Sequence, residues 1–291
     1  MCDPQNNATK KNPGLPQFLH IRTQEIMPFN FDGIKFIFNK SISKEFGINH
    51  VINITNGPDN GYRFGTSFTG NKEWIGLGWP TFQGEINTSG HVEASLIQQA
   101  NFMRFVTVVN YENSLVFPQL TVDWIGNNST ASIAASKVTA MNYPEFVDCT
   151  YLKTVTDNLT LGLRGYYRLF NNFWPMPECL ARYESGPFGW SVSISPHDMQ
   201  FCHYFNVNEN LRLGLMLNGQ FRDRRSIGQV GYQFSCPKKQ ITVRGMVDSE
   251  WNVRSTVEKP LTSLPIILLL SASLNHRNNR VGLGCGVILN K

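Results

Sequence analysis

The fold is decided by residues 241–291, which read ITVRGMVDSEWNVRSTVEKPLTSLPIILLLSASLNHRNNRVGLGCGVILNK. Apolar and polar side chains alternate along this stretch, so that Ile241 and Val243 fall on one side and Thr242 on the other. A period of two is the pattern of a β-strand with one apolar and one polar face. The alternation runs to the end of the stretch without a helical pattern, which predicts consecutive strands of one sheet.

The same alternation recurs upstream and predicts an all-β chain. The alternating segments are 46–55, 62–69, 92–96, 119–124, 159–164, 190–194, 211–218 and 229–235, and the turn signals between them include 57–61, 126–128, 206–210 and 276–280. Short strands at this spacing indicate a sandwich or a barrel. A sandwich leaves open sheet edges, whereas a membrane barrel needs one apolar outer band and no edge. The bulky apolar faces favour a transmembrane β-barrel.

The length of the chain sets the number of strands. At ~10 residues per strand plus short turns, the part after Pro28 has room for close to the 19 strands of the mitochondrial anion channel. An odd number makes the first and last strands, near Lys35 and Val287, pair in parallel. Apart from the alternation at 159–164, residues 142–187 are expected to be irregular, with a loop or broken strand at 170–177.

Composition limits the class of protein. Charged residues make up 16% of the chain, below the ~25% of ordinary soluble domains. The longest apolar run, 266–270, is far shorter than a membrane helix. A membrane β-barrel also lacks long apolar runs, because its lipid-facing residues alternate with lumen-facing ones. The net charge of +5 comes without basic runs that interleave with aromatics, so no nucleic-acid partner is expected.

No pattern of catalytic, cofactor-binding or metal-binding residues emerges. The six cysteines lack the CxxC spacing of metal or redox motifs, and the six histidines show no ligand spacing. The glycine-rich run at 282–286 has no helix after it, so it does not predict dinucleotide binding. The chain is therefore not expected to be an enzyme, and no cofactor is expected.

Three segments are expected along the chain. Residues 1–13 form a polar arm, residues 14–30 contain a short amphipathic helix, and residues 31–291 form the barrel. Leu15, Phe18, Leu19 and Ile26 make one apolar stripe on the helix. Pro28 ends it because proline cannot continue a helix.

Several short groups of residues resemble a known family in their order and spacing. They are Asn12-Pro13-Gly14, His20, Gly33, Asn39-Lys40 and His50 near the beginning, Gly228-Gln229-Val230-Gly231 in between, and Val247-Asp248-Ser249, Trp251, Val257-Glu258-Lys259, Leu264-Pro265 and Leu274-Asn275-His276 near the end. This set is similar to the pore-forming subunit of the mitochondrial outer-membrane protein translocase. The resemblance runs from about residue 12 to the end and is thin between 113 and 187.

The resemblance implies a channel in the mitochondrial outer membrane that imports precursor proteins, with the short helix inside the lumen. Its implied partners are presequence-bearing and other precursors, receptor and small translocase subunits, the lipid bilayer and further copies of the chain. One alternative is a metabolite and ion porin of the anion-channel type. The other is a soluble β-sandwich that acts as a binding module.

Strand parity gives the residues expected to line the lumen and to contact presequences. They are the acids Glu93, Asp123, Asp248 and Glu258 and the bases Lys35, Arg63, Arg212, Arg244 and Arg254. Parity also turns Arg164 toward the lumen. Rings of charge tune selectivity in a channel. The alternative is that each acid pairs with a nearby arginine, as Asp248 would with Arg244.

The last strand carries one further candidate signal. Mitochondrial barrels resemble each other in a final-strand pattern of polar, glycine and apolar positions that the insertion machinery reads. Gly284, Val287 and Leu289 fit this pattern, although its polar position falls on Gly282. The alternative is an ordinary glycine-rich closing strand.

Overall fold

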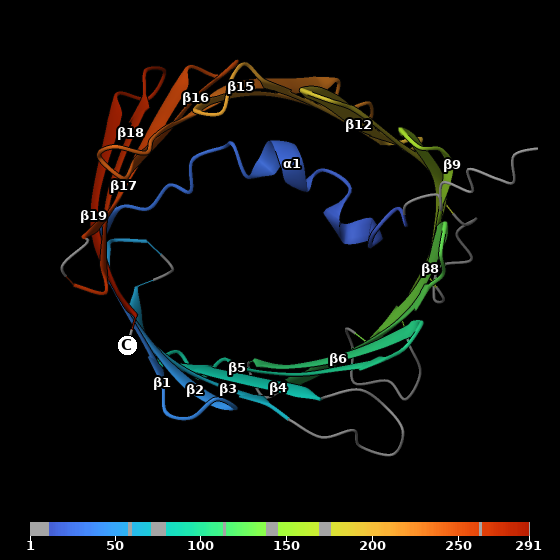
Figure 1. Cartoon of the computed structure of the whole chain (residues 1–291), viewed down its shortest axis with the longest axis horizontal. Helices are drawn as coiled ribbons and strands as arrows, with labels where there is room; N and C mark the ends of the chain where they lie inside the picture. The colour runs from blue at the N-terminus through green and yellow to red at the C-terminus, as the bar shows by residue number, and fades with distance from the viewer. Residues whose placement is uncertain are drawn as a thin grey trace, which may run out of the picture.

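The computed structural model describes residues 12–57, 60–70, 80–112, 115–137, 145–168, 176–261 and 264–290. Within these ranges the chain forms one 19-stranded sheet that closes on itself, seen end-on as a ring in Figure 1. The strands are β1 (Gly33–Ser41), β2 (Phe46–Ile54), β3 (Gly61–Thr69), β4 (Thr81–Asn87), β5 (Val92–Ala100), β6 (Met103–Glu112), β7 (Leu115–Ile125), β8 (Ser129–Ser136), β9 (Phe146–Thr156), β10 (Leu159–Arg168), β11 (Met176–Ser185), β12 (Phe188–Ile194), β13 (Asp198–Asn206), β14 (Leu211–Gln220), β15 (Arg225–Cys236), β16 (Ile241–Asp248), β17 (Asn252–Leu261), β18 (Ile266–Asn275) and β19 (Arg280–Asn290). The predicted all-β barrel is confirmed.

The barrel closes where its first strand meets its last. β1 and β19 pair in parallel, with Gly33 opposite Gly284 and Phe36 opposite Val287, whereas consecutive strands pair antiparallel, as β1 does with β2 and β18 with β19. An odd number of alternating strands requires this arrangement. The predicted parallel pairing is confirmed, and we call the contact between β1 and β19 the seam.

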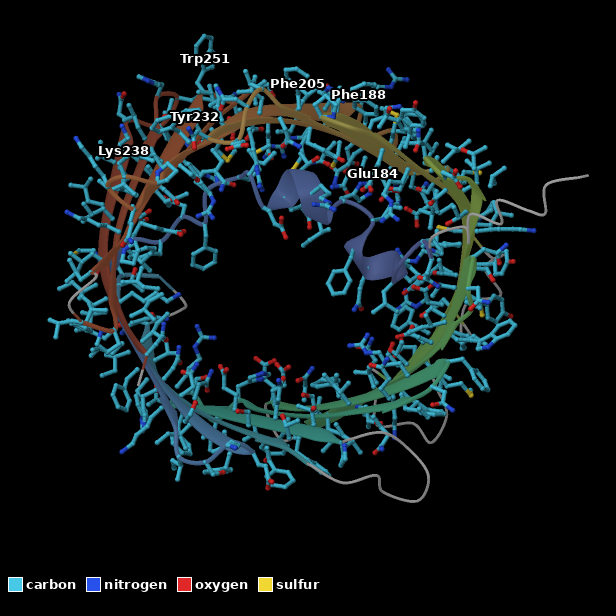
Figure 2. All side chains as sticks on the ribbon, in the orientation of Figure 1. Glu184, Phe188, Phe205, Tyr232, Lys238 and Trp251 are labelled. Atoms are coloured by element: carbon cyan, nitrogen blue, oxygen red, sulfur yellow. The ribbon has the colours of Figure 1, made fainter. Side chains whose placement is uncertain are left out.

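The outer face of the barrel is apolar and uncovered. Leu283 is 70% exposed and Val230 is 58% exposed, and Phe188, Phe205 and Trp251 point away from the ring in Figure 2. Such a continuous apolar surface is unfavourable in water and is the outer band expected of a barrel that faces lipid.

A segment that we call the strap, residues 12–32, lies inside the ring along the inner wall (Figure 1). It contains a 3₁₀ turn, η1 (Pro16–Phe18), and a short helix, α1 (Ile21–Gln24). The short helix expected inside the lumen is confirmed. Its regular part is shorter than the range 14–30 because His20, at φ −101° and ψ 5°, interrupts the helical backbone. None of the described helices is both long enough and apolar enough to span a bilayer.

The strap and the wall share a small apolar core. Leu19 of the strap is buried in one cluster with Leu152 of β9 and Leu180 of β11. Ile26 is also buried, against β14, where it lies next to Gly214. Two members of the predicted apolar stripe therefore hold the strap against the wall, while a third, Phe18, remains exposed.

The prediction of an irregular stretch over residues 142–187 is wrong for its described part. β9, β10 and β11 form regular antiparallel pairs there, with a single irregularity in register beside Leu159. Leu152 and Leu180, which lie on the inner face and pack on Leu19 of the strap, weaken the alternation in the sequence. The outward face still carries Leu161 and Leu163. Most of the loop expected at 170–177 lies outside the described residues, and its last positions belong to β11.

Candidate functional site

The candidate site is the lumen, whose wall is the face that the strap contacts. His20 Nδ1 lies 2.8 Å from Ser191 Oγ of β12, and the amide of Phe31 donates to Ser271 Oγ of β18. Cross-strand partners share a face of the sheet, so the register extends this inner face around the ring. All the charged residues predicted from parity carry inner-face positions: Lys35, Arg63, Glu93, Asp123, Arg212, Arg244, Asp248, Arg254 and Glu258. Their contact with presequences stays a prediction.

Two of the four predicted acids are held by arginines. Asp123 is only 3% exposed. Its carboxylate lies 3.3 Å from Arg104 Nη1 and accepts a hydrogen bond of 2.6 Å from Ser132. Glu258 forms an ion pair with Arg244 on the neighbouring strand. These acids therefore contribute little free negative charge to the lumen.

Asp248 has a structural role at the end of β16. Its Oδ1 accepts hydrogen bonds of 2.9 Å from the backbone amides of Glu250 and Asn252, and its Oδ2 accepts one of 2.7 Å from the Asn252 side chain. The alternative pairing of Asp248 with Arg244 is thus wrong, because Arg244 pairs with Glu258 instead. Asp248 shapes the turn between β16 and β17.

Glu93 is the predicted acid that stands exposed on the wall. Directly across from it on β4 is Glu85, which parity reasoning missed although it occupies an inner position. Glu85 lies 3.2 Å from Arg63 and keeps 47% of its side chain exposed. The two glutamates line a hollow of about 420 Å³ in the wall, together with Lys40. Because Arg63 offsets the charge of Glu85, the exposed carboxylate of Glu93 supplies the negative charge of this part of the inner face.

The predicted bases differ in their surroundings. Lys35 Nζ lies 4.8 Å from the ring centroid of Phe29 in the strap, within the range of a cation–π contact. Arg212 is exposed on β14, and Arg254 is half-buried on β17. The inner wall therefore carries both signs of charge on neighbouring strands.

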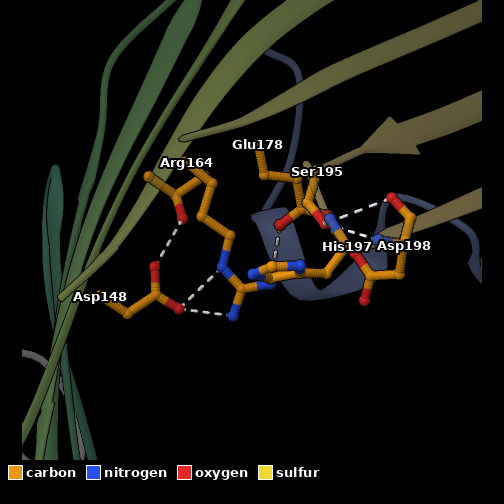
Figure 3. A network of polar contacts seen from close by, with 7 residues as sticks. Asp148, Arg164, Glu178, Ser195, His197 and Asp198 are labelled. Carbon is orange, nitrogen blue, oxygen red and sulfur yellow. Dashed lines mark hydrogen bonds and ion pairs between the residues drawn. The ribbon is translucent and has the colours of Figure 1, made fainter. Parts of the chain in front are cut away.

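Arg164, which parity places in the lumen, is the centre of a charge network on β9, β10 and β11. Its partners Asp148 and Glu178 were missed because that region was expected to be irregular. Arg164 lies 2.5 Å from Asp148 and 3.4 Å from Glu178 (Figure 3). One guanidinium shared by two carboxylates leaves a net charge of about −1. Regular strands in this region would have placed all three side chains on one face, since cross-strand partners share it.

Other ion pairs continue around this part of the wall. Arg168 lies 3.2 Å from Glu145, and Glu184 lies 3.8 Å from Arg182 and 3.9 Å from Arg22 of the strap. Figure 2 shows Glu184 on the inner side of the ring, next to the strap. The pair of Arg22 with Glu184 connects the strap to the wall electrostatically.

A polar pocket of about 390 Å³ lies between the strap and this wall. Its lining residues include Gln17, His20, Gln24, Asp123, Asp148, Arg164, Glu178 and Gln200. Burial lowers the pKa of His20 below its ordinary value of 6.5, so His20 is neutral when the strap is docked. The pocket combines acids, one arginine and amides, which suits polar contacts with a peptide.

The candidate insertion residues divide between the two faces of β19. Gly284 lies on the inner face next to Phe31, while Val287 and Leu289 carry outward positions opposite Phe36 and Phe38 of β1. Their recognition by insertion machinery stays a prediction. In the described ranges, no group of three or more histidine, cysteine or acidic side chains is placed to hold a metal ion.

Comparison with known proteins connects this barrel to one family. The family model described as Eukaryotic porin matches residues 12–284. Mitochondrial import receptor subunit TOM40 homolog 2 of Drosophila melanogaster is 30% identical over 285 residues, covering 96% of this chain and 84% of the fly protein. The TOM40 homolog of Homo sapiens is 26% identical over 282 residues, covering 96% and 78%. The Caenorhabditis elegans homolog is 25% identical, covering 96% and 94%.

Proposed function

We propose that this chain, which belongs to the eukaryotic porin family and within it to the TOM40 homologs, is the protein-conducting channel through which precursors enter mitochondria. The observation that carries the proposal is the extent of the likeness, which spans nearly the whole barrel and the strap. The barrel lies in the mitochondrial outer membrane. The lumen provides a water-filled passage, and the family consists of transport channels.

The lumen supplies weak contacts suited to a chain in transit. Glu85 and Glu93 on one side, and Asp148 with Glu178 on another, leave local negative charge that would attract a basic presequence. Exposed charges attract each other by only about 1 kcal/mol at 4 Å in water. Conduction requires binding that is strong enough for entry and weak enough for release, and contacts of this size meet both conditions.

The apolar outer face supplies the surface for partners. We propose that receptor and small translocase subunits and further copies of this chain contact this face within the membrane. Apolar side chains are exposed on strands all around the ring, such as Ile34 on β1, Leu163 on β10 and Leu283 on β19, and this surface supports the proposal.

Single-channel recording in a planar bilayer tests the function. We expect cation preference and voltage-dependent block by a basic presequence peptide. Block should weaken about 3- to 10-fold when Glu85→Gln and Glu93→Gln are combined, since two exposed charges act within one screening length. Glu209→Gln, in the turn before β14, is the matched control and should leave block unchanged.

A stable channel that ignores the peptide would overturn the import function and favour a metabolite and ion porin. Equal loss of block in Glu209→Gln would instead contradict the proposed role of Glu85 and Glu93, because a turn residue lies outside the hollow that they share.

A further inference from the structure

The end of the strap is fastened to the inner wall beside the seam. The amide of Phe31 donates a hydrogen bond of 3.2 Å to Ser271 Oγ, and the same hydroxyl donates one of 2.5 Å to Asn30 Oδ1. Ser273 Oγ donates one of 3.4 Å to Asp32 Oδ1. We call Asn30, Phe31 and Asp32 the latch.

The ring of Phe31 lies directly on the backbone of β19. Three successive inner positions of this strand are Gly282, Gly284 and Gly286. A Cβ added to Gly284 would lie 2.8 Å from Phe31 Cδ2, and one added to Gly286 would lie 3.1 Å from Phe31 Cζ. Contacts this short leave no room for a side chain. The glycines therefore form a trough that fits the ring.

The latch also connects to β1, the other strand of the seam. Lys35, opposite Gly286, places its Nζ 5.9 Å from the centroid of the Phe31 ring. Gly33, at φ +83°, turns the chain from the strap into β1, a conformation that glycine adopts readily. Phe31 thus lies two residues before β1 and packs on β19, so it ties the two strands together.

The seam is the contact of the barrel that most needs such support. Parallel pairing is slightly less stable per residue than antiparallel pairing. The paired residues are also far apart in sequence, with Asn39 and Asn290 separated by 251 positions, so no hairpin holds them near each other. At this far end of the seam Asn39 Nδ2 donates a hydrogen bond of 2.9 Å to Asn290 Oδ1.

We propose that the latch keeps the seam closed from inside the barrel, so that release of Phe31 from the glycine trough opens β1 from β19 before other strands separate. This role does not depend on what passes through the pore. It assigns the inner glycines of β19 a structural function within the folded protein.

Amide hydrogen exchange of the purified barrel in lipid bicelles tests the proposal. In Phe31→Ala, amides of residues 33–39 and 284–290 should exchange at least about 10-fold faster, because local opening of the seam becomes easier. Amides of β6–β9 should be unchanged. Phe18→Ala is the matched control, since Phe18 lies in the same strap, is 46% exposed and borders Thr154 and Thr160 on β9 and β10 instead of the seam. It should leave exchange at the seam within about 2-fold of the unchanged protein.

A second pair of variants probes the trough itself. Gly286→Ala places a methyl group against the ring, since its Cβ would lie 3.1 Å from Phe31 Cζ, and should raise exchange at the seam. In a protein that already carries Phe31→Ala, the same change should add little, because the ring that it displaces is absent. If Phe31→Ala fails to fold, Ser271→Ala removes only the hydrogen-bond partner of the latch and should raise exchange at the seam about 2- to 5-fold. Unchanged exchange at the seam, or an equal rise over all strands, would overturn the proposal.

Discussion

Replacing Arg164 with leucine would remove the guanidinium that two carboxylates share on the inner wall. In the structure Arg164 Nη2 and Nε lie 2.5 and 2.8 Å from Asp148 Oδ2, and Nη1 lies 3.4 Å from Glu178 Oε2 (Figure 3). Leucine keeps much of the apolar stem but leaves both carboxylates without their cation. We therefore expect the variant to be less stable than the unchanged barrel.

The exposure of the three side chains sets the size of the loss. Breaking a fully buried ion pair costs about 3–5 kcal/mol, whereas an exposed pair contributes about 0–1 kcal/mol. Asp148 and Glu178 each keep 20% of their side-chain surface exposed and Arg164 keeps 43%, so the network lies between these limits. We expect a loss of about 1–2 kcal/mol in the free energy of unfolding.

Urea unfolding of the refolded barrel in detergent, followed by circular dichroism, measures this loss. If unpaired charge is the cause, adding Asp148→Asn and Glu178→Gln to Arg164→Leu should restore stability to within about 0.5 kcal/mol of the unchanged protein. A triple variant as unstable as Arg164→Leu would show that packing of the arginine stem matters more than its charge. No loss in Arg164→Leu would show that water in the lumen screens the network. Either result refutes the reasoning.

Three further predictions concern the strap, the outer face and a turn. Burial lowers the pKa of His20, so docking of the strap should be strongest above pH about 6.5 and weaken as the pH falls below it. Protease access to the strap should therefore be greater at pH about 5.5 than at neutral pH. His20→Gln should remove this pH dependence. Val230→Arg on the outer face should destabilise the barrel in lipid by about 2–4 kcal/mol, while Gln229→Arg, its inner-face neighbour, should cost far less in the same unfolding assay. Asp248→Ala removes three hydrogen bonds at one turn and should speed amide exchange at Asn252 while leaving β2 unchanged.

Strand parity predicted which residues face the lumen because it depends on a local property. Successive side chains of a strand point to opposite faces, and a register slip of one residue would turn every apolar side chain inward. The positions of Lys35, Arg63 and Glu93 therefore followed from their immediate neighbours. The same reasoning placed Arg164 in the lumen but missed Asp148 and Glu178, because Leu152 and Leu180 on the inner face weaken the alternation of β9 and β11.

The pairing of charges could not be predicted from proximity in sequence. Arg244 and Asp248 are four residues apart, which in a strand corresponds to about 13 Å, so the two side chains do not meet. Arg244 reaches Glu258 instead, because the hairpin between β16 and β17 sets Arg244 opposite Thr256 and next to Glu258. Ion pairs on a barrel wall are fixed by hairpin register, which requires the length of each turn.

The glycines of β19 show how one strand satisfies two requirements at once. Its outward residues, such as Val281 and Leu283, must be apolar because they face lipid. The inward residues under the latch, Gly282, Gly284 and Gly286, lack side chains, as the short approach of Phe31 to Gly284 requires. The sequence alone shows a strand that alternates apolar residues with glycine, and this pattern fits an insertion signal as well as a packing surface. The two functions are compatible, since an insertion factor can read the strand before the strap covers its inner face.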